Sequence, residues 1–469
     1  MTELCQRLPK VTAETFVVPL EEKRYLIYAP LRQTACVGNA RVVNHLMDCK
    51  ESRPQAADPA YDDLRNLFRV MGILDAGAEP KPITRFKGTP EPTEVTLFLT
   101  TACNLRCTYC YAQAGDTAKK FMKPDVAFRG IEFVARNAAR LGRDKFAVIY
   151  HGGGEPTVNW PTLTESHAFA TSLAKELGIG FSSSTATNGV LRDSQIDWII
   201  SHLNGASVSF DGSPELQDVH RPKVGGGGSS SQVIHTLTRF DEGGLPYGIR
   251  VTVTADHIPH LVESVKFICS RFKPKRLQVE PAYQMGRWKD APSAETDAFI
   301  EAFREAQVAA RALGQEIYFS GAKVGHLSNH FCGVTQDSFS LSPDGGVSGC
   351  FEVFAEDEKD ADVFFYGHTD DNGQFQFNKK RLANLRAQTV DRHAFCSTCF
   401  AKWNCGGDCY NKSLKVNGSA EFQGSDRCHV IRELTKDQIL ERIAKSGGLA
   451  WLGDDEPQDG KSAGKEFLL

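Results

Sequence analysis

The chain has 469 residues, of which 41% are hydrophobic and 24% are charged, a length that suggests two to four domains and a composition typical of globular proteins. Its 54 basic and 58 acidic residues give a net charge of −4, and the basic residues do not gather in one stretch, which argues against a nucleic-acid partner. With no run of about 18 apolar residues and no apolar stretch behind the N-terminal charges, we expect no membrane span, no secretory signal and a cytoplasmic location.

Residues 1–88 are predicted to form a small separate unit. Two short strands, Phe16–Pro19 and Arg24–Tyr28, flank a polar turn, and two stretches with apolar residues at helical spacing follow them. The segment 76–82 (AGAEPKP) is rich in residues that interrupt regular structure, so it indicates a linker to the next unit.

From Glu94 to Pro281, strand-like runs alternate with helix-like runs. The expected strands are Val95–Leu99, Phe146–Tyr150, Phe181–Ala186, Ala206–Phe210, Gly248–Val253 and Arg276–Glu280. This order implies parallel strands with right-handed crossovers, and six such units predict an α/β fold with an open, partial (β/α)6 barrel. Active sites of barrels lie at the C-terminal ends of the strands.

The remainder is less regular apart from a helix expected near Ala294–Leu313. The run Gly225–Ser231 is interpreted as a flexible connector, and the Gly-, Asp- and Lys-rich C-terminus as a mobile tail. We therefore expect four segments: an N-terminal domain at 1–88, the partial barrel at 89–290, a cysteine-rich domain at 291–446 and the tail at 447–469.

The fourteen cysteines are unevenly placed. In a cytosolic chain thiols stay reduced, so metal or cluster ligation is favoured over disulfides. Three cysteines lie within eight residues and seven more lie between 332 and 428. The remaining four are interpreted as buried or surface thiols without a chemical role: Cys5, Cys36, Cys49 and Cys269.

Cys103, Cys107 and Cys110 directly follow the first expected barrel strand. Three thiolates can ligate three irons of a [4Fe–4S] cluster and leave the fourth iron without a protein ligand. An open coordination position is what makes a metal site catalytic. The spacing alone leaves two alternatives, a zinc site lacking its fourth ligand or a cluster completed by a remote cysteine.

Polar motifs follow the next three strands. His151–Pro156 (HGGGEP) contains glycines that let a backbone approach a ligand closely and a glutamate, Glu155, that can pair with a cationic amino group. Thr187–Gly189 (TNG) follows the third strand, and Ser209–Gly212 (SFDG) ends the fourth. Taken singly, each motif also fits a helix cap, a turn or a surface charge.

Together, the C-x₃-C-x₂-C pattern, the aromatic Tyr109 before its last cysteine, and the GGEP-like and S-x-D-G-like segments resemble the radical S-adenosylmethionine (SAM) superfamily. The resemblance implies that a reduced cluster cleaves SAM into methionine and a 5′-deoxyadenosyl radical, which abstracts hydrogen from a substrate. It implies SAM contacts by Tyr109, Gly153, Gly154, Glu155, Asn188, Ser209 and Arg221. Arg250 is a weaker candidate for the same role.

The downstream cysteines resemble the SPASM extension of that superfamily, C-x₉₋₁₅-G-x₄-C followed by C-x₂-C-x₅-C-x₃-C and a last cysteine. The resemblance implies two auxiliary [4Fe–4S] clusters, three in all. One would use Cys396, Cys399, Cys405 and Cys428, and the other Cys332, Cys350 and Cys409, with its last site open or filled by a further ligand. A zinc ribbon at the C-x₂-C and C-x₃-C pairs is the alternative.

SPASM proteins typically act on peptides or proteins, so the resemblance implies a maturase that installs a thioether or C–C crosslink or a related oxidation. It also implies an electron donor such as flavodoxin or ferredoxin. The N-terminal unit resembles winged-helix domains that bind leader peptides along a strand edge; a purely structural cap is the alternative. Glu280 and Glu352 are the candidate bases.

Two other functions stay open. A sulfatase-type maturase, which makes formylglycine, tends to have an acidic base directly after the cysteine that corresponds to Cys350. Here Phe351 stands in that place and Glu352 comes one residue later. A non-catalytic iron–sulfur electron carrier is the third possibility, and the intact GGEP-like and S-x-D-G-like motifs argue against it.

Overall fold

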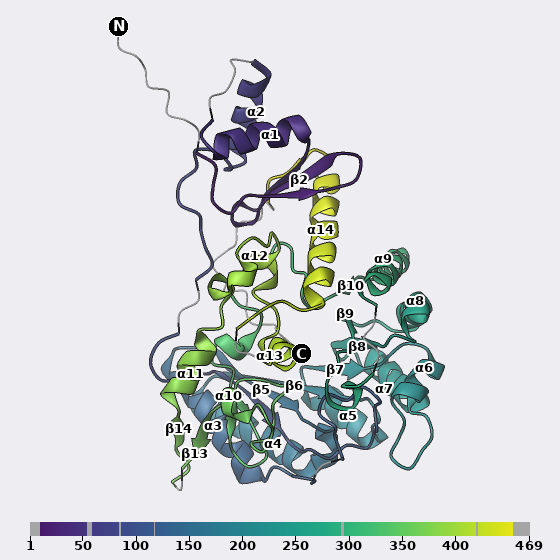
Figure 1. The fold of residues 1–469 in the computed structure, drawn as a ribbon. Helices are drawn as coiled ribbons and strands as arrows, with labels where there is room; N and C mark the ends of the chain where they lie inside the picture. The colour runs from purple at the N-terminus through teal and green to yellow at the C-terminus, as the bar shows by residue number, and fades with distance from the viewer. Residues whose placement is uncertain are drawn as a thin grey trace. The chain divides into compact units, whose positions relative to one another are not determined.

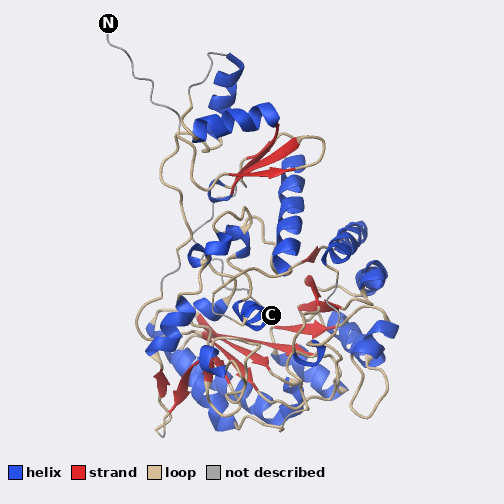
Figure 2. Ribbon diagram, viewed as in Figure 1, coloured by secondary structure: helices blue, strands red, loops and turns tan. Residues whose placement is uncertain are grey.

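A computed structural model describes residues 10–53, 59–83, 86–116, 118–291, 295–370, 372–418 and 421–453. The described residues divide into two compact units (Figures 1 and 2). One comprises those of Met1–Thr84, Gly321–Phe331 and Gln388–Lys461, and the other those of Arg85–Ser320 and Cys332–Ala387. No helix in the described ranges is both long and apolar enough to cross a bilayer.

The larger unit is built on one sheet with the strand order β10-β9-β8-β7-β6-β5-β4-β11-β12-β13-β14. The six central strands are β4 (Glu94–Phe98), β5 (Lys145–His151), β6 (Gly180–Thr187), β7 (Gly205–Ser209), β8 (Tyr247–Val253) and β9 (Arg276–Pro281). They are parallel neighbours in chain order. The predicted partial (β/α)6 barrel is therefore confirmed, with each strand within one residue of its expected ends.

The helices that connect these strands lie along the sheet, as Figure 1 shows. They are α3 (Pro124–Arg140), α4 (Trp160–Leu177), α5 (Asp193–His202), α6 (Pro214–His220), α7 (Ser230–Glu242), α8 (Leu261–Arg271) and α9 (Thr296–Ala312). Short 3₁₀ segments are η2 (Pro156–Asn159), η3 (Ile258–His260), η4 (Gly286–Trp288) and η5 (Gly333–Thr335). The segment expected to be only a flexible connector ends in a helix, because α7 begins at Ser230.

The sheet continues beyond the barrel on both sides. The short strand β10 (Ile317–Tyr318) pairs with β9, and β11 (Ser340–Leu341) pairs with β4, both in parallel. The antiparallel strands β12 (Val347–Ser348), β13 (Phe365–Thr369) and β14 (Phe375–Phe377) extend it, with α10 (Ala361–Phe364) and α11 (Lys379–Arg386) beside them. The segment that holds Cys332 and Cys350 is thus built onto the barrel sheet.

The two faces of the barrel sheet differ in composition. Alternate side chains of a strand point to opposite faces, and the face toward the helices carries buried apolar residues such as Val95, Val208 and Val251. The opposite, inner face is small and polar in its middle. There β6, β7 and β8 present Ser182, Ser184, Ser207, Ser209 and Gly248, as the strand register requires. The middle of the inner face therefore carries small side chains, with Arg250 and Gln278 beside them in the register.

The smaller unit contains a second sheet of order β1-β2-β3-β15. Its elements are β1 (Phe16–Pro19), β2 (Arg24–Ala29), η1 (Pro30–Arg32), β3 (Thr34–Asn39), α1 (Ala40–Lys50), α2 (Pro59–Val70), η6 (Val390–Arg392), η7 (Ala394–Cys396), α12 (Lys402–Cys405), α13 (Tyr410–Asn417), α14 (Arg427–Lys445) and β15 (Ala450–Trp451). The expected hairpin and both helices are present. A third strand, β3, was not expected.

One finding concerns the segment expected to be a mobile tail. Ala450 and Trp451 form β15, which pairs antiparallel with Cys36 and Ala35 of β3. The Trp451 side chain is 3% exposed. The start of that segment is therefore part of the N-terminal sheet, whereas residues after 453 lie outside the described ranges.

A buried ion pair joins the N-terminal segment to the cysteine-rich segment within this unit. The Glu14 carboxylate accepts a hydrogen bond from Lys402 Nζ at 2.8 Å and another from Trp403 Nε1 at 3.1 Å. Both charged side chains are about nine-tenths buried. Residues at 14 and at 402–403 therefore fold as one body, although the sequence assigned them to different domains.

We predict that Glu14→Ala lowers the free energy of unfolding by about 3–5 kcal/mol, because it leaves the Lys402 ammonium buried without its counter-charge. Urea denaturation followed by tryptophan fluorescence measures this. Glu132→Ala, which removes an exposed helical ion pair with Arg136, is the matched control and should cost about 0–1 kcal/mol. Equal losses in the two variants would contradict the assignment.

Candidate active site

The loops after β4 and β5 are joined by backbone hydrogen bonds. Gly154 N donates to Thr100 O at 3.0 Å, and Glu155 N donates to Ala102 O at 2.9 Å. The approach is so close that a Cβ on Gly154 would lie 2.0 Å from the Ala102 carbonyl oxygen. The GGEP-like segment is therefore packed directly against the segment that leads into Cys103.

Glu155 connects three of the four motif-bearing loops. Its side chain is 2% exposed; Oε1 accepts from Thr157 Oγ1 at 2.8 Å and Thr187 Oγ1 at 3.0 Å, and Oε2 accepts from Asn188 N at 2.7 Å. Burial raises its pKa and these donors oppose the rise. Oε2 accepts this single hydrogen bond among the described residues, so it retains capacity for the predicted ammonium group of SAM.

Asn188 extends the same set of contacts to the cysteine loop. Its Nδ2 donates to Asn104 Oδ1 at 2.7 Å and lies 3.7 Å from Cys103 Sγ. Leu105 N is also directed at that sulfur, at 3.4 Å. Donors directed at a sulfur stabilise its thiolate form, the form that ligates metal.

The three thiols of this loop lie close enough to act on one another electrostatically. Burial, followed by the nearby Glu155 carboxylate, raises the pKa of Cys103 to about 12, and burial raises that of Cys107 to about 11. Without added positive charge these thiols stay neutral at pH 7, whereas a metal deprotonates a coordinating thiol outright. Cys103, Cys107 and Cys110 in one loop, with two donors directed at the Cys103 sulfur, fit the predicted [4Fe–4S] cluster.

Nowhere in the described ranges do three or more His, Cys, Asp or Glu side chains converge closely enough to hold a single metal ion. A [4Fe–4S] cluster distributes its thiolates over different irons, so the spread of Cys103, Cys107 and Cys110 is compatible with it. The ligand assignment itself stays a prediction.

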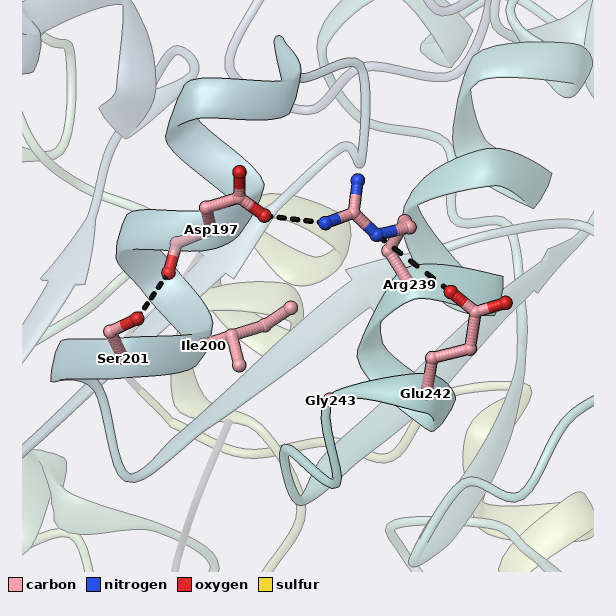
Figure 3. A pocket seen from close by; sticks show the side chains of 6 residues that line it. All are labelled: Asp197, Ile200, Ser201, Arg239, Glu242 and Gly243. Atoms are coloured by element: carbon pink, nitrogen blue, oxygen red, sulfur yellow. Dashed lines mark hydrogen bonds and ion pairs between the residues drawn. The ribbon is translucent and has the colours of Figure 1, made fainter.

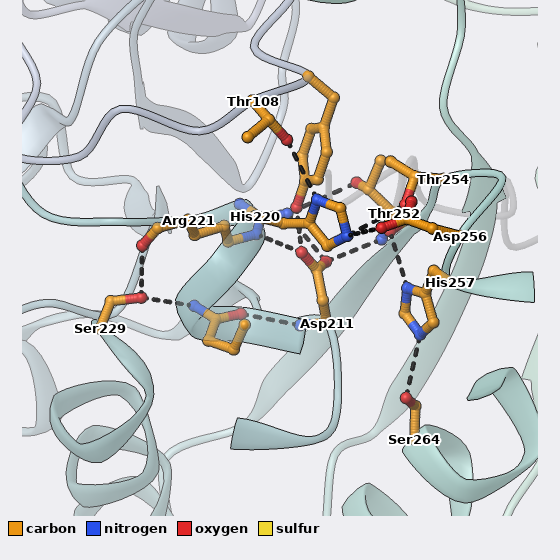
Figure 4. A network of polar contacts seen from close by, with 12 residues as sticks. Thr108, Asp211, His220, Arg221, Ser229, Thr252, Thr254, Asp256, His257 and Ser264 are labelled. Carbon is orange, nitrogen blue, oxygen red and sulfur yellow. Dashed lines mark hydrogen bonds and ion pairs between the residues drawn. The ribbon is translucent and has the colours of Figure 1, made fainter. Parts of the chain in front are cut away.

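Asp211, which sequence reasoning did not single out, organises a buried network below this loop (Figure 4). Its carboxylate is fully buried and accepts from Arg221 Nε at 2.9 Å, Arg221 Nη2 at 3.2 Å and Thr252 N at 3.0 Å. Tyr109 OH donates to the same carboxylate. The Arg221 guanidinium also lies over the Tyr109 ring, 5.0 Å from its centroid.

His220 links the cysteine loop to the loop after β8. Its Nδ1 lies 3.2 Å from Thr108 Oγ1, and its Nε2 lies 3.2 Å from Thr254 Oγ1 and 3.1 Å from Asp256 Oδ2 (Figure 4). Thr108 N donates to His220 O at 2.9 Å. The segment around His220 and Arg221 therefore packs against the cysteine loop and holds it in place.

The structure brings most of the predicted SAM contacts to the C-terminal edge of the barrel strands. Gly153 packs so tightly that a Cβ there would lie 2.1 Å from the Phe354 ring, and Ser209 lies on the inner face of β7. Arg221 differs from the expectation in one respect: two of its guanidinium nitrogens are already bonded to Asp211. The pairing became visible only in the structure, although Asp211 and Arg221 lie ten residues apart in the sequence.

The two candidate bases lie in different environments. Glu280, at the end of β9, is 3% exposed, and its Oε1 accepts from Gln278 Nε2 at 2.9 Å and Ser320 N at 2.8 Å. Glu352 is half-buried, its backbone N lies 3.4 Å from Cys350 Sγ, and its charge contributes to the raised pKa of Tyr111. Of the two, Glu352 is nearer to the cysteine loop, which Tyr111 directly follows.

The downstream cysteines are divided between the two units. Cys332 and Cys350 belong to the larger unit, and the remaining five belong to the smaller one. Within the smaller unit, burial and then the nearby Cys399 and Cys428 raise the pKa of Cys396 to about 12. Burial, Asp408 and Cys428 raise that of Cys405. These four thiols are those predicted to share one auxiliary cluster.

Asp408 holds that second cysteine group together. Its backbone N lies 3.2 Å from Cys405 Sγ, and its carboxylate accepts from Arg427 Nε at 2.7 Å and Ser425 Oγ at 3.1 Å. Asp408 and Arg427 are both at least 95% buried. The pair therefore fixes the residue before Cys409 against the residue before Cys428.

A pocket of about 430 Å³ lies away from these loops, between α5 and α7 (Figure 3). Arg239 crosses it, paired with Asp197 and with Glu242. The residues that line it stand near the C-terminal ends of both helices, and none of them belongs to a predicted motif. In a barrel these helix ends lie at the face opposite the active site, so the pocket has no part in the proposed chemistry.

We predict that Gly154→Ala abolishes stable SAM binding, because the added methyl group must displace the Ala102 carbonyl and with it the cysteine loop. Equilibrium dialysis of the cluster-loaded protein with SAM measures this. Gly77→Ala, where a Cβ has no neighbour within 4 Å, is the control. Parent-like SAM affinity in Gly154→Ala would contradict the packing described here.

We further predict that Asp211→Asn lowers the free energy of unfolding by about 3–5 kcal/mol, because Arg221 stays buried and charged. Burial is the largest single influence and raises the pKa of Asp211, but Arg221, His257 and Tyr109 together lower it more, so the net shift is downward. The carboxylate then stabilises the fold above its unfolded pKa of about 3.9, and this contribution is lost as the pH falls through the folded pKa.

The loss in Asp211→Asn should therefore be constant from pH 7 to about 5 and shrink only at lower pH. Urea denaturation at several pH values measures it. Asp256→Asn, in the same network but with its aspartate side chain 60% exposed, is the control and should cost about 0–1 kcal/mol. A loss in Asp211→Asn no larger than this would show that the buried pair does not organise the site.

Comparison with known proteins places these loops in a family. The family model described as "Radical SAM superfamily" matches residues 97–268. Pre-heme d1 synthase from Dinoroseobacter shibae is 24% identical over 75% of this chain and 90% of its own length. Mycofactocin maturase MftC from Mycobacterium tuberculosis is 25% identical over 70% of this chain and 81% of its own. The chain spans 57% of the length of another relative, an uncharacterized protein from Methanocaldococcus jannaschii, at 28% identity over 37% of this chain.

Among solved structures, native anSMEcpe with bound AdoMet has the same fold, with a TM-score of 0.59 at 18% identity. The match covers 75% of this chain and 99% of that one. The residues matched by the family model, 97–268, contain the cysteine loop. They also contain the three loops that are hydrogen-bonded to the cysteine loop or to one of its neighbours. Residues 97–268 therefore match the radical SAM superfamily, and the described barrel has the fold of the anSMEcpe structure.

Proposed function

We propose that this chain is a peptide or protein maturase that uses SAM to remove hydrogen from its substrate and install a crosslink, thioether or C–C, or a related oxidation. A [4Fe–4S] cluster on Cys103, Cys107 and Cys110, when bound, supplies the electron that cleaves SAM to methionine and a 5′-deoxyadenosyl radical. The chain's own residues hold SAM, orient the substrate and exclude water.

One observation carries this proposal: the four motif-bearing loops form a single hydrogen-bonded assembly. Glu155 is bonded to the backbone of Asn188, Asn188 is directed at Cys103, and Tyr109 is bonded to Asp211. Residues far apart in the sequence are thus fixed around one sulfur-rich loop at the C-terminal edge of the strands. Such preorganisation is what a reactive cofactor pair requires.

A substrate larger than a metabolite is supported by the relatives and by the inner face of the barrel. MftC is named a maturase, and one anSMEcpe structure, with a TM-score of 0.57, holds AdoMet together with a peptide. The serines and the glycine on the inner face of β6 to β8 leave room above the sheet for an extended segment. Glu352 and Glu280 are the bases proposed to take the substrate proton.

The auxiliary clusters proposed for Cys396, Cys399, Cys405 and Cys428 and for Cys332, Cys350 and Cys409 would receive an electron from the substrate radical. In the first set, Asp408 N is already directed at Cys405. An open iron in the second set would suit a substrate thiolate, which leads to a thioether. A protein donor, flavodoxin or ferredoxin, would supply the reducing electron.

The N-terminal unit is proposed to bind a leader segment along the outer edge of β1. The two edge strands of its sheet are β1 and the two-residue β15, which pairs with Ala35 and Cys36 of β3. The four-residue β1 is the longer edge, and it pairs only with β2 in the described residues. Addition of a strand to a free edge gives main-chain hydrogen bonds without demanding a particular sequence. Residues 16–19 are therefore the proposed contact.

Two other substrates follow from specific observations and are separated by the same experiment. The similarity to pre-heme d1 synthase extends over 90% of that protein, so a tetrapyrrole is one rival substrate. A cysteine or serine of a sulfatase, oxidised to formylglycine, is the other. Mass analysis distinguishes a peptide crosslink, formylglycine and a modified tetrapyrrole from one another.

We predict that the anaerobically reconstituted protein, given SAM and dithionite, forms 5′-deoxyadenosine, and that Cys103→Ala reduces this to background because the cluster loses a ligand. Liquid chromatography of the reaction measures it. Cys269→Ala, a buried cysteine of α8, is the control and should keep parent activity. Absence of 5′-deoxyadenosine from the iron-loaded parent would refute the proposal.

A further inference from the structure

Two arginines hold the backbone carbonyl groups of the cysteine loop. Arg106 Nη1 donates a hydrogen bond to Cys103 O at 3.1 Å. Arg287 Nη1 donates to Cys107 O at 3.0 Å, and the backbone N of Arg287 donates to Cys110 O at 3.1 Å. Each of the three cysteines is therefore fixed through its own carbonyl group, and Arg287 fixes two of them.

Arg287 comes from a distant part of the sequence, the turn η4 in the loop after β9. Arg287 and Cys107 are 180 positions apart. The residue before it, Gly286, has a φ of +56°, and a Cβ there would lie 2.2 Å from Cys110 O. Because only glycine permits this conformation and this close approach, the pair Gly286-Arg287 places a guanidinium group directly against the cysteine loop.

The Arg287 side chain also holds the turn that follows the cysteine loop. Its Nη2 donates to Ala114 O at 2.7 Å, and Nε and Nη2 donate to the two carboxylate oxygens of Asp116 at 2.6 and 2.7 Å. Arg106 Nη2 donates to Gly115 O in the same turn at 3.4 Å. All three guanidinium nitrogens of Arg287 are thus bonded, which gives the side chain one fixed orientation.

The positive member of the Arg287–Asp116 pair is the more buried one. The Arg287 side chain is 17% exposed, whereas that of Asp116 is 43% exposed. Burial raises the pKa of Cys107, and the Arg287 charge is among the groups that oppose this rise. The hydrogen bond to Asp116 is the main reason that the pKa of Arg287 is raised, and Cys110 and Cys107 add to it. The guanidinium therefore acts on the thiols from within the fold, while its counter-charge is partly in water.

We propose that Arg287 is a positioning residue that fixes the cysteine loop and makes the cluster on that loop easier to reduce. Uptake of an electron adds negative charge to a group already held by three thiolates, and a nearby cation favours the more negative form. Net charge and hydrogen bonding around a cluster are among the features that set its reduction potential. The proposal rests on the cluster that the proposed function assigns to Cys103, Cys107 and Cys110.

The test is an anaerobic redox titration of the iron-loaded, full-length chain, followed by electron paramagnetic resonance. The signal that changes when SAM is added identifies the cluster with an open iron. Arg287→Gln removes the charge and keeps an amide donor. The ratio of reduced to oxidised cluster, at the midpoint potential of the parent, should then fall about tenfold, which is about 59 mV for one electron. Arg287→Lys, which keeps the charge without the fork, should lower the ratio less.

Asp116→Asn distinguishes an electrostatic effect from a loss of structure. It removes the charge that balances Arg287 and keeps the shape of the side chain, so the same ratio should rise about two- to threefold. A residue that only held the loop in place would produce no rise. Arg136→Gln and Glu132→Gln, which remove the two charges of an exposed ion pair on α3, are the matched controls and should keep the ratio of the parent.

The proposal is overturned if the ratio does not rise in Asp116→Asn, or if iron-loaded Arg287→Gln keeps the ratio of the parent. Iron content shows whether Arg287→Gln is loaded, and if it is not, Asp116→Asn decides alone. A parent protein without a SAM-responsive signal would refute the cluster assignment, and with it both the proposed function and this role. A SAM-responsive parent whose variants show no shift would keep the function and lose only the role of Arg287.

Discussion

The buried carboxylate of Glu155 is the constraint on which the geometry of the site depends. A carboxylate removed from water is stable only when donors replace its solvation, and here these donors come from Thr157, Thr187 and Asn188. Thr157 lies in η2, which begins directly after Glu155, whereas Thr187 ends β6 and Asn188 directly follows it. The hydrogen bonds to this one carboxylate therefore hold together the loops after β5 and β6, which are about thirty residues apart in the sequence.

The same requirement explains why the sheet can support a ligand site on its inner side. In closed (β/α)8 barrels, bulky branched side chains fill the interior as a packed core. In this chain β6 to β8 present serines and a glycine inward, whereas the register places the bulky Phe98 of β4 and Ile149 of β5 on the same face. Because β10 and β11 extend the sheet at its two sides, the strands need not close into a ring, and the inner space stays available.

The barrel was predictable because its signals are local. Most of its strands and connecting helices are rich in apolar residues, β6 (GFSSSTAT) being an exception, and the predicted strand ends agree with the structure to one residue. The short strands β10 to β12 have two residues each, which is too few for an alternating apolar pattern to be recognised in the sequence. The strand β3 contains Cys36 and Gly38, which are not typical of strands. Pairing of β15 with β3 joins residues more than 400 positions apart.

The loops of the candidate site were also predictable, but the roles of their polar residues were less so. Cys103 and Glu155 are recognisable from their motifs alone, since each motif is contiguous. Asp211 was overlooked because its partners lie 10, 41 and 102 positions away. For the same reason Arg221 was read as a ligand contact, although most of its donors are engaged within the fold.

Electrostatic balance inside the barrel follows from these pairings. Asp211 and Arg221 neutralise each other, and the negative charge of Glu155 is held by uncharged donors. SAM bears an ammonium, a sulfonium and a carboxylate, so it brings one net positive charge into this space. Glu155 can compensate the ammonium, and ligand thiolates lower the cost of the sulfonium.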